Sequence, residues 1–133
     1  MRRVHRDERG LVLKAMAFGL IVLVLVGIAA VDAGSIFITK YNLAQLAQDA
    51  AFQGALQYRT SESRGGACDA AEEFVAQEDP DARIPEDFCE VDTQNGHVTV
   101  SLRKTAGTFV AKYFDFLEKY TRVEESGESG ALR

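Results

Sequence analysis

Residues 11–58 read LVLKAMAFGLIVLVLVGIAAVDAGSIFITKYNLAQLAQDAAFQGALQY, and this stretch decides the fold. It opens on an apolar run from Ala15 to Val31 and continues without a proline to Tyr58. At the α-helical rise the run alone is about 26 Å long, close to the ~30 Å hydrocarbon core of a bilayer, and apolar residues extend it at both ends. We therefore predict one long helix. Its residues 11–33 cross a membrane, and its residues 34–60 project from that membrane.

A cleaved secretory signal is the main alternative for the same run. Such signals normally carry an apolar region of only about 7–15 residues, which is shorter than the run here. A cut after Ala33 would place small residues at the cleavage site, but Asp32 lies beside it. The length of the run favours a retained anchor.

The charge is distributed unevenly along the chain. The net charge is −5 overall, yet residues 1–14 carry five basic and two acidic side chains, whereas residues 33–133 carry ten basic and seventeen acidic ones. A basic segment before a membrane span usually stays on the cytoplasmic side. We therefore expect a cytoplasmic basic tail or leader at residues 1–10 and an extracytoplasmic body. The acidic body lacks the basic surface that a nucleic-acid partner requires.

The outer part of the long helix carries two separate apolar patches. At 100° per residue, Leu43, Ala47, Ala50 and Gly54 fall on one side, with Tyr58 and several alanines extending the same small-residue stripe. Phe52 and Leu56 lie away from this stripe, among polar residues. Either one patch packs on the protein's own domain and the other on a neighbouring subunit, or both contact the same domain.

The remainder predicts a small α+β domain at residues 61–122, with a flexible tail at 123–133. Alternation in His97–Arg103 predicts a strand, and Asn95-Gly96 predicts a tight turn that makes a hairpin with the preceding strand. Phe109, Phe116 and their aromatic neighbours would form a core-facing stripe on the last helix. The expected elements are a helix at 67–78, strands at 88–92 and 97–103, a helix at 106–120 and a short strand near 122–124.

Two cysteines, Cys68 and Cys89, are present. If the body is extracytoplasmic, its compartment permits disulfides, and a bond between them would close a loop of about twenty residues and add roughly 3 kcal/mol. The alternative is two free, partly buried thiols. Two cysteines and two distant histidines do not make a zinc site.

The sequence contains no motif for catalysis or for cofactor binding. It has no glycine-rich phosphate loop and no nucleophile elbow. The acidic segment Glu78–Asp81 lacks the ligand spacing of a calcium loop, so a solvated loop is expected there. We therefore predict that the protein is not an enzyme, needs no cofactor or metal, and takes no small-molecule substrate.

Asp32 lies at the outer end of the apolar run, where a carboxylate facing lipid is costly. It could reach headgroup water, or it could pair with a cation on another subunit. Small residues four apart surround it in two rows, Ala29 with Ala33 and Ala30 with Gly34, and such rows allow helices to approach closely. The predicted lateral contacts are therefore Ala29, Ala30, Asp32, Ala33, Gly34, Phe52 and Leu56.

Three features of residues 7–55 resemble the TadE/TadG-like proteins of tight-adherence (Flp-type) pilus assembly. These are Glu8-Arg9-Gly10 before the apolar run, Val31-Asp32-Ala33-Gly34 at its outer end, and the alanine-rich helix that carries Asp49-Ala50-Ala51. The residue five positions after Gly10 is Ala15 and not glutamate, so prepilin-type processing there is not part of the expectation.

The resemblance implies a pilin-like minor subunit or assembly factor of a pilus or secretion apparatus. Such a protein would be anchored in the cell membrane by a single span and would contact lipid and other subunits through its helix. The alternative is an independent anchored module whose outer domain binds a ligand or a partner protein through its aromatic helix or its acidic loop.

Overall fold

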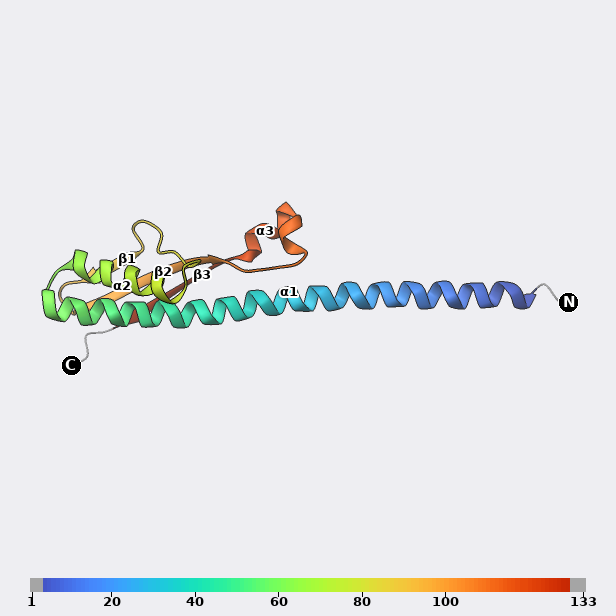
Figure 1. The fold of residues 1–133 in the computed structure, drawn as a ribbon, viewed down its shortest axis with the longest axis horizontal. Coiled ribbons are helices and arrows are strands. Elements are labelled where there is room, and N and C mark those ends of the chain that lie inside the picture. Colours follow the sequence, from blue (N-terminus) through green and yellow to red (C-terminus); the bar gives the residue numbers. More distant parts are fainter. Residues whose placement is uncertain (1–3, 130–133) are drawn as a thin grey trace.

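Helix α1 (Val4–Ser61) runs the length of the molecule in the computed structural model, which describes residues 4–129 (Figure 1). The fold is α+β, as expected: a small domain folds back along the C-terminal half of α1, and the N-terminal half extends away from it. The helix is unbroken because no proline interrupts it. It begins at Val4, so it includes most of the segment expected as a basic tail or leader.

Helix α1 is long and apolar enough to form a single membrane span. From Leu11 to Val26 every side chain is exposed in the isolated chain, and the large apolar ones point in all directions around the helix. A helix that is apolar all round needs an apolar surrounding. The domain does not supply it for this part of α1.

The chain reverses after Ser61 and enters helix α2 (Arg64–Glu78). Ser63 caps this helix, since its hydroxyl accepts a hydrogen bond from the Gly66 N–H at 3.1 Å. The helix therefore begins three residues earlier than expected from the sequence. It packs on α1 through a small-residue face made of Ala67, Ala71 and Val75.

Three antiparallel strands form a sheet in the order β1 (Cys89–Asp92), β2 (His97–Thr105) and β3 (Arg122–Ser129). The predicted hairpin is confirmed: Asp92 pairs with His97, and Gly96 takes the positive φ of 68° that the turn requires. The alternation in β2 places Val98, Val100 and Leu102 on its buried face.

The expectation of a flexible C-terminal tail from residue 123 is wrong, because residues as far as Ser129 form strand β3. It pairs with β2 over eight residues, from Thr105↔Arg122 to Val98↔Ser129, and it also packs along α1. At Gly127 the strand lies directly on the helix backbone, where an added Cβ would overlap the backbone of Ala47 and Gln48. The remaining residues of the expected tail, 130–133, lie outside the described part of the chain.

The segment between β2 and β3 departs most from expectation. In place of one helix over 106–120, the chain is irregular to Val110, forms a 3-10 turn η1 (Ala111–Tyr113) and then a short helix α3 (Asp115–Thr121). Its five large aromatic residues are 47–75% exposed, so they are not the predicted core stripe. Figure 1 shows this segment standing off α1 near the middle of the long helix.

Candidate functional site

The Asp32 carboxylate is held by backbone groups of its own chain. It accepts hydrogen bonds from the N–H groups of Phe109 at 2.7 Å, Val110 at 2.9 Å and Ala111 at 3.0 Å. Consecutive N–H groups that converge in this way form an anion-binding concavity. Next to it the Ser35 hydroxyl donates a hydrogen bond to the Gly107 carbonyl at 2.5 Å. We call these four hydrogen bonds together the Asp32 clasp.

The clasp explains why a carboxylate is tolerated at the end of the apolar run. Asp32 is only 7% exposed, and a buried carboxylate requires donors. Here the donors come from the segment that connects β2 to α3. Neither headgroup water nor a cation on another subunit is needed to account for Asp32. The clasp also ties that segment to α1 at the point where the apolar run ends.

Sequence reasoning missed the clasp because the donors were assigned to a continuous helix. The residues Gly107-Thr108-Phe109-Val110 include a glycine and two β-branched side chains, all of which lower helix propensity. That composition was the available signal against a continuous helix. The pairing with Asp32, which is 77 residues away from Phe109, has no local signature.

The small-residue stripe on the outer part of α1 packs on the protein's own domain. Leu43, Ala47 and Ala50 are almost completely buried beneath the sheet and α2. At Gly54 an added Cβ would lie 3.0 Å from the Ala67 carbonyl oxygen and 3.1 Å from a Val98 methyl group. Small residues are therefore needed here so that α2 and β2 can approach α1.

The opposite side of α1 stays free along its length. Ala30 and Gly34, each two residues from Asp32, lie about 200° around the helix from it. No described atom would contact a Cβ added at Gly34. Farther out on this side Phe52 and Leu56 are 37% and 38% exposed. We call this surface the back face. Gly34 on it is half-buried, and the other members are exposed: Ala30, Ile38, Tyr41, Gln45, Phe52 and Leu56.

The other two predicted contact residues lie beside the back face rather than on it. Ala29 and Ala33 are exposed, but they point between the back face and the side that carries Asp32. The structure therefore separates the predicted set into a clasp residue, Asp32, a free back face, and a flanking pair. Leu56 also borders a groove between α1 and α2 that Phe74 lines from the other side.

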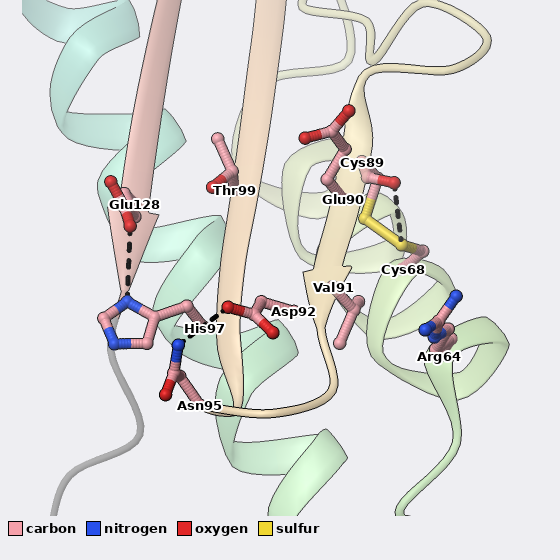
Figure 2. A pocket seen from close by; sticks show the side chains of 10 residues that line it. All are labelled: Arg64, Cys68, Cys89, Glu90, Val91, Asp92, Asn95, His97, Thr99 and Glu128. Atoms are coloured by element: carbon pink, nitrogen blue, oxygen red, sulfur yellow. Dashed lines mark hydrogen bonds and ion pairs between the residues drawn. A yellow bond between two sulfur atoms is a disulfide. The ribbon is translucent and has the colours of Figure 1, made fainter.

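The disulfide between Cys68 and Cys89 is present, with the two Cα atoms 5.9 Å apart. It fastens α2 to β1, as expected. Beside it lies an open hollow of about 550 Å³, and the lining residues drawn in Figure 2 come from α2, the hairpin and β3.

Several polar groups of this hollow are held by contacts within the sheet and its turn. The His97 ring lies 3.2 Å from a Glu128 carboxylate oxygen. Asp92 accepts hydrogen bonds from the Gln94 N–H and the Asn95 side chain, each at 2.9 Å, and with the first as the larger effect they hold the pKa of Asp92 below its usual value. These contacts brace the hairpin turn. Among the side chains described, those of residues 10–129, no three histidine, cysteine or acidic groups converge as a metal site.

Comparison of the chain with protein-family models, with curated proteins and with solved structures finds no match.

Proposed function

We propose that the protein is a membrane-anchored, pilin-like minor subunit or assembly factor of a tight-adherence pilus or related secretion apparatus. It acts by helix-mediated assembly and has no catalytic role. Residues 11–33 cross the cell membrane, the basic N-terminal segment faces the cytoplasm, and the disulfide-bonded domain lies outside. The charge asymmetry and the disulfide support this orientation.

The observation that carries the proposal is the division of α1 into a covered side and a free side. The domain covers the small-residue stripe and leaves Phe52 and Leu56 of the back face more than one-third exposed. Beyond the span, a monomeric anchored domain has no need of Tyr41, Phe52 and Leu56 exposed on one side of its helix. A subunit that packs its helix against the helices of others does.

The test compares two alanine-to-leucine changes in the span. Ala30→Leu adds three carbons to the back face, where close helix approach needs small residues. Ala17→Leu adds the same carbons about 20 Å deeper on another side of the helix. Ala30→Leu should abolish co-purification with the pilus or secretion subunits encoded with this protein, whereas Ala17→Leu should leave it intact. Equal co-purification of both variants would refute the lateral contact at Ala30.

Orientation has its own test. A periplasmic reporter enzyme fused after Arg133 should be active, and a reporter that works only in the cytoplasm should be silent. The opposite pattern would place the domain inside and would contradict the proposed arrangement.

A further inference from the structure

The aromatic residues of the segment between β2 and β3 are exposed together although large aromatic side chains usually bury their area in a core. Phe109 is 69%, Tyr113 75%, Phe116 68% and Tyr120 61% exposed. Phe114 is 47% exposed and contacts Phe116, with ring centroids 5.8 Å apart. All five rings come from the short segment 109–120, and we call them the aromatic cluster.

The Asp32 clasp fixes the height of this cluster along α1. Asp32 lies 21 residues beyond Leu11, a rise of about 32 Å, which matches the ~30 Å hydrocarbon core. Phe109 binds the Asp32 carboxylate directly through its N–H, and Gly107 accepts from Ser35. When residues 11–31 fill the hydrocarbon layer, the aromatic cluster therefore lies at the level of the outer headgroups.

A further exposed ring lies close to this height. Phe37 on α1 is exposed and stands about 8 Å beyond Asp32 along the axis, at the outer edge of the headgroup layer. Aromatic rings gather at both edges of membrane spans because they have an apolar body and tolerate the polar headgroup layer. Two elements that are far apart in sequence thus present rings to one layer.

The charges in the cluster suit zwitterionic headgroups. Lys112 and Lys119 flank Asp115 and Glu118, so the segment is neutral overall. Each lysine lies over a neighbouring tyrosine ring, Lys112 at 5.1 Å from the Tyr113 centroid and Lys119 at 5.0 Å from that of Tyr120. Their ammonium groups can reach lipid phosphates while the stems cover the rings.

We propose that the aromatic cluster inserts into the outer headgroup layer and forms a second membrane contact beside the span. The partner is the lipid surface itself. The contact holds the domain at a fixed tilt and rotation relative to the bilayer, and so directs the back face of α1 toward neighbouring subunits. It rests on the membrane span of the proposed function.

The absence of tryptophan from the chain allows a direct test, because one introduced indole is then the only one that fluoresces. Single variants Phe116→Trp, Phe18→Trp and Phe88→Trp of the full chain are reconstituted in phosphatidylcholine vesicles that contain brominated phosphatidylcholine. All three positions are exposed aromatic residues, so each change is conservative. The Phe18→Trp variant reports on the span, and the Phe88→Trp variant, in the domain near β1, reports on water.

The fluorescence of the Phe116→Trp variant should shift to shorter wavelength. Bromines near the glycerol backbone should quench it more than bromines deep in the acyl chains do. The Phe18→Trp variant should show the reverse depth preference, and the Phe88→Trp variant should be quenched only by aqueous iodide. Iodide quenching of Phe116→Trp as strong as that of Phe88→Trp overturns the second contact. So does shielding of the Phe116→Trp indole from both quenchers, which would mean that protein covers the cluster.

The Phe18→Trp variant separates the two failures. If bromines quench the indole in Phe18→Trp but not the one in Phe116→Trp, the span is present and only the second contact is wrong. If bromines fail to quench Phe18→Trp, the membrane span fails and the proposed function fails with it.

Discussion

Replacing Gly127 with alanine should destabilise the sheet, although glycine to alanine in a strand normally does the opposite. An interior strand glycine costs roughly 0.5–1 kcal/mol relative to alanine, so a free strand would gain stability from the change. Here the new Cβ would overlap the backbone of Ala47 and Gln48 on α1. Backbone atoms in a helix cannot move aside as a flexible side chain can.

The size of the stability change in Gly127→Ala follows from these two opposing contributions. Overpacking of this kind typically costs about 1–3 kcal/mol, which exceeds the gain in strand propensity. Separating β3 from α1 would also lengthen the 2.6 Å hydrogen bond from the Gln48 side chain to the Glu128 carbonyl. We therefore expect a net loss of about 1–2 kcal/mol, which corresponds to a roughly 5–30-fold larger open population of the sheet.

Amide hydrogen exchange of the detergent-solubilised protein, followed by mass spectrometry, measures that population element by element. Peptides from β2 and β3 should exchange roughly 5–30-fold faster in Gly127→Ala, while peptides from the apolar part of α1 should not change. Gly107→Ala is the matched control, because a Cβ added there meets no atom within 4 Å. Slower exchange in β3 of Gly127→Ala would show that the strand does not lie on the helix backbone.

Three further predictions concern the disulfide, the clasp and one ion pair, and the first two use the same exchange measurement. Replacing Cys68 and Cys89 together by alanine opens a loop with a sequence separation of 21 residues and should cost about 3 kcal/mol in α2 and β1; unchanged protection there would refute a stabilising disulfide. Asp32→Asn should speed exchange at residues 109–111 and leave the hairpin unchanged, since the amide lacks the charge that three N–H donors require; equal exchange at 109–111 would refute the clasp. Partial burial raises the pKa of Asp79. The hydrogen bond from Lys104 and two backbone N–H groups together lower that pKa by more, so it lies below its usual value. The stability from this pair is present above the unfolded pKa of about 3.9 and is lost as pH falls through the folded pKa; in acid unfolding, Lys104→Gln should weaken that loss, and an unchanged acid profile would contradict the pairing.

The elements that the sequence predicted well are those with a strong local pattern. The long helix follows from an apolar run without proline, and the hairpin follows from alternation in β2 with Asn95-Gly96 before it. The disulfide followed from the cysteine count and the expected compartment. In the helix and the hairpin the information lies within a few residues of the feature it determines.

The features that sequence reasoning missed depend on contacts between distant residues. Strand β3 contains Glu124-Glu125-Ser126-Gly127, which is a poor strand by composition, yet it forms because β2 supplies a ladder and α1 a surface. The aromatic cluster was assigned to the core because aromatic residues at helical spacing usually are buried. Its exposure depends on where the Asp32 clasp holds the segment, which local pattern does not encode.

The back face was only partly predictable. Helical periodicity separated Phe52 and Leu56 from the small-residue stripe, but it left open whether the domain would cover both patches. The sheet and α2 cover the small-residue stripe, and Phe52 and Leu56 remain partly exposed. In the proposed role, a helix of another subunit covers them.

Photo-cross-linking in cells tests that role most directly. A photoreactive phenylalanine analogue replaces Phe52 on the back face or Phe88 on the domain, two phenylalanines that are 37% and 40% exposed. We predict that position 52 gives adducts with the N-terminal helix of another pilus-type subunit or of a second copy of this chain, and that position 88 does not. Absence of such adducts at position 52, or equal adducts at both positions, would contradict helix-mediated assembly through the back face.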